Sequence, residues 1–238
     1  MRFLFICGCG HSGTSLMLGI FANSSNVAVT RDETFALSKL SVEKFMDSVK
    51  KQVSGKTLFV EKTPRHVHYL EKICANTESE ALILLRNPLD VVASLKKRGF
   101  TVEQSISRYI NDNVAWQRYA KHPKVKVIRY EDLVDSSKNI LADLTQRYGV
   151  DLEAGDLKRQ EDSRLYFKGQ GATRIEKTDG KGEAAHLALR NYQIRQKLQN
   201  MNGEWKNRLT QDESQMVMEW CAPAVQKFYS DLDLAAAA

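Results

Sequence analysis

The feature that most constrains this chain is a glycine-rich loop between an apolar run and a helical pattern near the N-terminus. Residues Arg2 to Cys7 are rich in Phe, Leu and Ile, and the run stops at Gly8-Cys-Gly-His-Ser-Gly-Thr-Ser15. A buried parallel strand ends in this way. Ser15 to Ala22 then has the apolar content and length of a helix. The order strand, glycine loop, helix predicts the first unit of an α/β fold.

Three further β-rich runs follow the same scheme. Thr57–Val60, Ala81–Leu85 and Val125–Ile128 are each followed by a polar turn and a helical pattern. Strands spaced by helices indicate βαβ units. We therefore expect a P-loop-like, mostly parallel sheet flanked by helices in three α/β/α layers. The helices are expected at 34–53, 65–74, 89–97, 102–119, 135–148 and 211–229.

Length favours one α/β-sized domain, because 238 residues are few for two full cores. We expect this single domain over residues 1–234. The four alanines at 235–238 have no periodicity and are expected to be a disordered tail or a cloning remnant. Residues 168–183 contain four glycines and no apolar period, which predicts a mobile loop.

The charge balance favours an anionic ligand. Lysine and arginine number 35 against 29 aspartates and glutamates, a net charge of +6. The basic residues are dispersed and form no aromatic-basic module, so no nucleic-acid partner is expected. The four cysteines form no CxxC pair, so neither a zinc ribbon nor a disulfide framework is indicated.

Nothing in the sequence indicates export or a membrane span. The N-terminal apolar run is about five residues long, shorter than the core of a signal peptide. No stretch approaches the roughly 20 apolar residues of a transmembrane helix. We expect a cytoplasmic protein.

The glycine loop has the composition of an anion-binding turn. Small residues let the backbone approach an anion, successive N–H groups point into the turn, and the helix dipole adds about half a positive charge. The alternative is a tight strand-to-helix turn without a ligand. A Walker A motif requires lysine where Thr14 stands, which disfavours an ATP or GTP hydrolase.

Two other segments follow predicted strands and should face the same crevice. Arg86-Asn-Pro-Leu-Asp-Val-Val-Ala-Ser94 begins with an arginine that can clamp a phosphate. Glu61-Lys-Thr-Pro64 contains Lys62, a cation that can neutralise charge on a transferred group. Each segment also has an interpretation without a ligand. Arg86 could simply pair with Asp90, and the segment around Lys62 could be a solvated turn before a helix.

Together these segments resemble the sulfotransferase family. Cys9 to Ser15 resembles its 5′-phosphosulfate loop, and Arg86 with Ser94 eight residues on resembles its 3′-phosphate motif. Glu61 to Pro64 is similar to a strand-end motif of the carbohydrate, tyrosyl-protein and bacterial branches. Tyr130-Glu-Asp-Leu133 and Gly203-Glu-Trp-Lys-Asn207 resemble downstream segments.

The resemblance implies a metal-independent enzyme that moves a sulfuryl group from 3′-phosphoadenosine 5′-phosphosulfate (PAPS) to a hydroxyl or amine. The product nucleotide is 3′,5′-adenosine bisphosphate (PAP). Arg86 and Ser94 would bind the 3′-phosphate, and Lys62 would stabilise the sulfuryl oxygens. The 5′-phosphosulfate would lie on the loop, whose implied binding residues are Gly10, His11, Ser12, Gly13, Thr14 and Ser15.

Two positions leave the implied mechanism open. His11 stands where the family usually has lysine or arginine, and histidine is a weaker, pH-dependent cation. A general base is also required, because the acceptor must lose a proton. Glu33 matches the catalytic glutamate of the carbohydrate and tyrosyl-protein members; Asp32 and His66 are the other candidates.

Two other functions fit parts of the pattern. One is an ATP-dependent small-molecule kinase with a degenerate P-loop. The other is a non-catalytic nucleotide-binding module, in which Glu33 and Lys62 would be dispensable. For a sulfotransferase, the acceptor could be a small molecule, a sugar or a peptide, and variable loops set that choice.

Overall fold

The computed structural model describes residues 1–30, 33–152 and 200–229. Asp32, the glycine-rich segment 168–183 and the tail at 235–238 lie outside the described residues, as does the end of the expected domain at 234. Within the described part, no helix is long and apolar enough to cross a membrane.

The fold is built on a parallel sheet of five strands in the order β2-β3-β1-β4-β5. The strands are β1 (Arg2–Gly8), β2 (Val27–Val29), β3 (Leu58–Lys62), β4 (Ser79–Leu85) and β5 (Val125–Arg129). Strands β1, β3, β4 and β5 confirm the four runs predicted from the sequence. The sequence did not predict β2, since three residues are too few to show a pattern; β2 is held beside β3 by its ladder.

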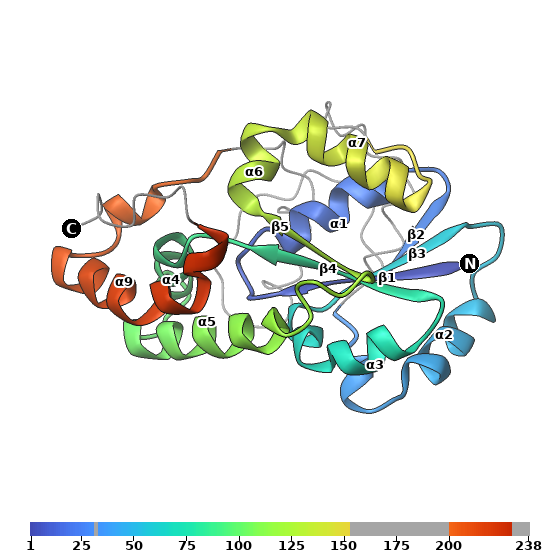
Figure 1. Ribbon diagram of the computed structural model, residues 1–238, viewed down its shortest axis with the longest axis horizontal. Helices are drawn as coiled ribbons and strands as arrows, with labels where there is room; N and C mark the ends of the chain where they lie inside the picture. The colour runs from blue at the N-terminus through green and yellow to red at the C-terminus, as the bar shows by residue number, and fades with distance from the viewer. Residues whose placement is uncertain (31–32, 153–199, 230–238) are drawn as a thin grey trace.

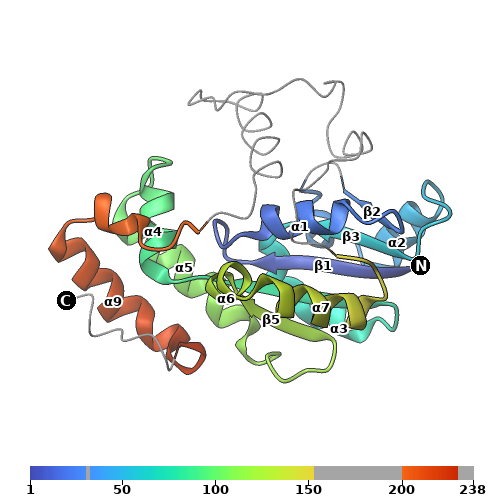
Figure 2. The ribbon, with the colours of Figure 1, turned by 90° about the horizontal axis from the view of Figure 1, so that it is seen from above.

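Helices cover both faces of the sheet, which confirms the expected three-layer α/β fold (Figure 1). On one face lie α1 (Thr14–Ala22), α6 (Tyr130–Asp135) and α7 (Ser137–Tyr148). The other face carries α2 (Val42–Lys50), α3 (Leu70–Ala75), α4 (Pro88–Lys96) and α5 (Val102–Gln117). Helix α9 (Gln211–Val225) packs on α4 and α5 at one end of the molecule (Figure 2).

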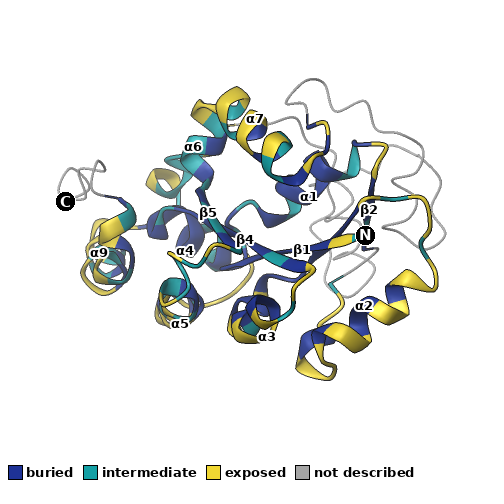
Figure 3. Ribbon diagram, turned by 45° about the vertical axis from the view of Figure 1, so that its right-hand side comes forward, coloured by how far each residue is buried: buried dark blue, intermediate teal, exposed yellow. Residues whose placement is uncertain are grey.

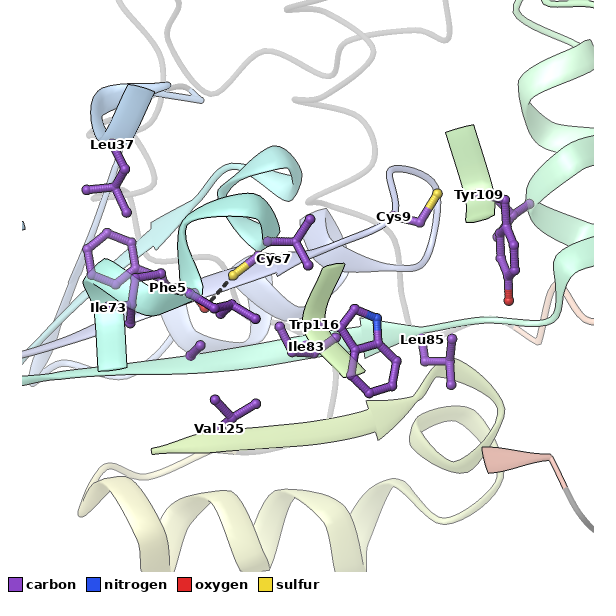
Figure 4. Packing of buried hydrophobic residues seen from close by; sticks show 14 of the residues in the cluster. Phe5, Cys7, Cys9, Leu37, Ile73, Ile83, Leu85, Tyr109, Trp116 and Val125 are labelled. Atoms are coloured by element: carbon purple, nitrogen blue, oxygen red, sulfur yellow. Dashed lines mark hydrogen bonds between the residues drawn. The ribbon is translucent and has the colours of Figure 1, made fainter. Parts of the chain in front are cut away.

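The alternation of side chains along β1 creates two cores. Phe3, Phe5 and Cys7 point to the face covered by α2, α3 and α5, where Figure 4 shows Phe5 and Cys7 among other buried side chains. Leu4 and Ile6 point to the opposite face, against α1 and α7. Figure 3 shows that the outer faces of α2 and α7 are exposed. A central strand buried on both faces explains why its sequence is an unbroken apolar run.

Several predicted helix boundaries are wrong. The expected helix at 34–53 divides into η1 (Ala36–Ser38) and α2, because Ser41 caps the start of α2 by accepting from the Lys44 N–H. The expected helix at 65–74 begins as a 3-10 helix, η2 (Pro64–Tyr69), and becomes α-helical only in α3. Helix α6 was not predicted, and the last expected helix ends at Val225 before η5 (Gln226–Phe228).

Candidate active site

The candidate site lies at the carboxyl end of β1, the central strand. β3 lies beside β1 on one side, with Lys62 level with Ile6, and β4 lies on the other, with Leu84 level with Gly8. Lys62 ends β3, and Arg86 directly follows β4. The glycine loop is thus flanked by one cation from each neighbouring strand. Open parallel sheets bind ligands in this kind of crevice, where the chain direction across the sheet reverses.

Gly13 sets the end of the loop and the start of α1. It caps the helix with φ +89°, a left-handed conformation that favours glycine. A Cβ atom at this position would lie 2.7 Å from Cδ2 of Tyr130. Since Gly13 has no side chain to cap the helix, the first N–H groups of α1, including those of Thr14 and Ser15, depend on other acceptors.

Ser12 contributes to the loop in two ways. Its N–H donates to the Cys9 carbonyl at 3.3 Å and closes a turn. Its hydroxyl oxygen is buried and has no hydrogen-bond partner within the described residues. A buried hydroxyl without a partner is costly. The loop therefore has at least one polar group that fits an anionic ligand.

His11 connects the loop to α4. Its φ of +72° is unusual for a residue with a side chain. The His11 Nδ1 atom lies 2.9 Å from the Ser94 hydroxyl, although the two residues are 83 positions apart. This hydrogen bond brings together the loop and the arginine–serine segment, as their resemblance to one nucleotide site implies.

Arg86 is held on several sides by the protein. Its Nη1 donates to the His11 carbonyl at 3.3 Å and its Nη2 to the Met201 carbonyl at 2.7 Å. The guanidinium also stacks 4.2 Å from the Tyr130 ring centre. Its Nε is buried without a hydrogen-bond partner among the described residues. Each terminal nitrogen carries two N–H groups and each carbonyl accepts from one of them, so Arg86 keeps N–H groups for an anion.

Asp90 supports this arrangement from the first turn of α4. Its carboxylate lies 3.8 Å from Arg86 Nη2 and accepts the N–H groups of Gly203 and Trp205 at 3.1 and 3.3 Å. Burial raises the pKa of the Asp90 carboxyl, while Arg86 and the two N–H groups oppose that rise. The pairing of Arg86 with Asp90 is therefore present, and Asp90 shares its carboxylate with the start of η4 (Glu204–Asn207).

Lys62 and Glu33 form an ion pair on the β3 side of the loop. The Lys62 Nζ lies 2.7 Å from Glu33 Oε1, with 1% of the lysine side chain and 13% of the glutamate side chain exposed. Two of the residues implied by the resemblance are thus in direct contact.

His66 belongs to a buried network centred on Glu61. The ring Nδ1 lies 2.9 Å from Glu61 Oε2, and Nε2 accepts the Leu37 N–H at 3.3 Å. Because Nε2 accepts, Nδ1 carries the proton that is donated to Glu61. The other Glu61 oxygen accepts from the hydroxyls of Thr34 and Thr63. Both ring nitrogens of His66 are therefore used inside the protein.

Replacing Glu61 with glutamine should destabilise the protein by about 1 to 3 kcal/mol, the usual cost of leaving buried hydrogen-bonding groups without partners. An amide keeps the shape of the carboxylate but turns an N–H₂ group toward donors. Thr34 follows Glu33 directly, so kcat should fall as well. The melting temperature of Glu61→Gln measures the effect. Glu71→Gln, at an exposed glutamate, is the control. Equal melting temperatures for the two variants would contradict the role of Glu61.

The sequence did not assign a role to Glu61, although one signal was available. Glu61 directly follows the apolar run 57–60, lies within β3 and is fully buried, and a buried carboxylate requires partners. Arg108 on α5 was also not singled out. The sequence feature that points to Arg108 is Asp112, an acidic residue one helical turn further on. The structure shows that Asp112 is buried.

Comparison with known proteins gives a match at the level of the fold. No family model matches the sequence, and no curated protein matches it. Among solved structures, the sulfotransferase domain from the curacin biosynthetic pathway is similar with a TM-score of 0.60 and 15% identity, over 92% of this chain and 96% of that chain.

Two further structures agree. A sulfotransferase from Alicyclobacillus acidocaldarius has a TM-score of 0.57 and 15% identity, over 100% of this chain and 98% of that chain. Mouse sulfotransferase SULT7A1, solved with PAP, has a TM-score of 0.59 and 13% identity, over 100% of this chain and 89% of that chain. The chain therefore has the sulfotransferase fold. Across the described residues, no group of three His, Cys, Asp or Glu side chains could hold a metal ion.

Proposed function

We propose that this protein is a sulfotransferase that moves a sulfuryl group from PAPS to a hydroxyl or amine acceptor. The observation that carries the proposal is the contact between His11 and Ser94, which joins the two motifs expected to bind the two ends of one nucleotide. The sulfotransferase fold and the buried Lys62–Glu33 pair beside the loop support it.

The donor site would use the glycine loop, the start of α1 and the arginine–serine segment. The N-terminal amides of α1, with Ser12, Gly13, Thr14 and Ser15, would bind the 5′-phosphosulfate. Arg86 and Ser94 would bind the 3′-phosphate, the group that distinguishes this nucleotide from ATP. The unpartnered buried Ser12 hydroxyl and Arg86 Nε fit an anionic nucleotide.

Transfer would take place on the β3 side of the loop. The donor supplies an activated sulfuryl group: a bond from sulfur to the acceptor oxygen or nitrogen forms as the bond from sulfur to the 5′-phosphate oxygen breaks. Glu33 would take the acceptor proton, and Lys62 would stabilise negative charge on the sulfuryl oxygens. Glu33 is preferred to His66 because both ring nitrogens of His66 already have partners.

His11 is assigned to the donor rather than to proton removal. Its ring is hydrogen-bonded to Ser94 on α4, which follows β4, whereas Lys62 ends β3 on the other side of β1. A protonated His11 could still stabilise the leaving phosphate, in the place of the basic residue that it replaces.

Titration calorimetry with PAP, and separately with ATP and magnesium, tests the donor assignment. PAP should bind without metal and more tightly than ATP. Arg86→Ala should weaken PAP binding by about 10- to 100-fold, the value of hydrogen bonds to a charged group. Arg118→Ala, on an arginine side chain that is 72% exposed, is the control and should not change the affinity. Tighter binding of ATP with magnesium would favour a kinase.

A non-catalytic nucleotide module makes a different prediction. It would bind PAP, release no PAP from PAPS, and keep its nucleotide binding when Glu33 or Lys62 is replaced. Release of PAP from PAPS in the presence of an acceptor library, followed for the wild type and for Glu33→Gln, separates the two functions.

A further inference from the structure

Arg108 is a cation beside the glycine loop that the proposed donor site does not use. It lies on α5, which packs against α4, α9 and η2 and also contacts β1. Its guanidinium reaches Gly10: a Cβ atom added to that glycine would lie 2.6 Å from Arg108 Nη2. The lack of a side chain at Gly10 is therefore what lets Arg108 approach the loop.

The guanidinium of Arg108 keeps its hydrogen-bonding capacity. Its Nε lies 3.8 Å from Asp112 Oδ2, an ion pair without a hydrogen bond, and its Cζ lies 5.8 Å from the Phe100 ring centre. No described residue accepts a hydrogen bond from Arg108, and 29% of its side chain is exposed. The two terminal nitrogens form a fork suited to a carboxylate, phosphate or sulfate group.

Asp112 fixes the position of Arg108 without saturating it. The Asp112 side chain is buried, and its Oδ1 lies 2.8 Å from His68 Nε2 on η2. The carboxylate is thus shared between a histidine and an arginine. This arrangement orients the Arg108 guanidinium while leaving its terminal N–H groups for a ligand.

The position of Arg108 relates it to the acceptor rather than to the donor. Arg86, Ser94 and Tyr130 gather around His11 and Gly13. Arg108 instead meets the loop at Gly10, and its partner Asp112 is bound to η2, the element that follows Lys62. In-line transfer requires the acceptor to approach opposite the leaving phosphate, and the proposed base Glu33 is paired with Lys62 on this same side.

We propose that Arg108 binds an anionic group of the acceptor, so that the preferred acceptors carry a carboxylate, phosphate or sulfate near the reacting hydroxyl or amine. This inference rests on the proposed sulfotransferase function. It makes Arg108 a residue that determines acceptor specificity.

The test measures anion binding to protein already saturated with PAP. Inorganic sulfate is titrated as a small probe, and 4-hydroxybenzoate is compared with its neutral counterpart 4-hydroxybenzamide. The wild type should bind sulfate, and should bind the benzoate more tightly than the benzamide. Arg108→Gln should weaken sulfate and benzoate binding by about 10- to 100-fold and leave benzamide binding unchanged. Arg118→Gln, with the same charge change at the end of the same helix, should behave as the wild type.

Two further variants separate charge from folding. Arg108→Lys should retain part of the sulfate affinity, because the charge remains but the fork is lost. Gly10→Ala should lower the sulfate affinity with Arg108 still present, since the new methyl group displaces the guanidinium. Thermal denaturation shows that each variant is folded.

The outcomes distinguish this inference from the proposed function. If PAP does not bind the wild type, the sulfotransferase proposal fails. If PAP binds and Arg108→Gln leaves sulfate affinity unchanged, only the anionic-acceptor inference fails. A loss of affinity for PAP or PAPS in Arg108→Gln would place Arg108 at the donor and overturn the inference as well.

Discussion

Replacing Glu33 with glutamine is expected to reduce kcat by about 100- to 10,000-fold, the range contributed by a general base. Glutamine preserves the length of the side chain, and its amide oxygen can still accept from the Lys62 Nζ, now 2.7 Å from the carboxylate. The variant loses the ability to take up the acceptor proton. The affinity for PAP should stay the same, because Glu33 is not among the groups proposed to bind the donor. Steady-state release of PAP at saturating acceptor measures kcat.

Glu78→Gln is the matched control for this variant. Glu78 also pairs with a lysine, Lys50, at 2.7 Å, but that pair is exposed and remote from the loop. Its loss should leave kcat unchanged. A Glu33→Gln enzyme with kcat within a few-fold of the wild type would reject Glu33 as the base. Asp32→Asn and His66→Gln are then the variants to measure, since these residues were the other candidates.

The fold was largely predictable because its strongest signal is local. Four apolar runs of strand length, each followed by a helical pattern, were enough to indicate a parallel sheet between helices. The errors occur where local patterns compete. Residues 34–53 have helical content throughout, yet Ser41 starts a new helix inside that range. The three residues of β2 gain their strand conformation from β3 and not from their own sequence.

For the candidate site, the sequence predicts which residues lie at one edge of the sheet but not the contacts between them. Glycines, Arg86 and Lys62 stand at strand ends, and that position alone places them at one edge of a parallel sheet. The pairing of Lys62 with Glu33 joins residues 29 positions apart, and that of Arg86 with the Met201 carbonyl joins residues 115 apart. Such contacts depend on the packed fold. His66 illustrates the difference, since a histidine after a strand resembles a base until its two partners are known.

Replacing Lys62 with methionine is expected to lower kcat by about 100- to 1,000-fold, the usual effect of removing one group that stabilises transition-state charge. Methionine matches the length of the lysine stem and suits the buried position, where 1% of the side chain is exposed. Lys50→Met is the control, because it breaks an exposed ion pair with the same 2.7 Å separation.

The double variant Lys62→Met/Glu33→Gln gives the sharper result. If the cation and the base act in one transfer step, the double variant should lose much less than the product of the two single losses. Fully multiplicative losses would mean that the pair in the structure does not act as a unit in catalysis.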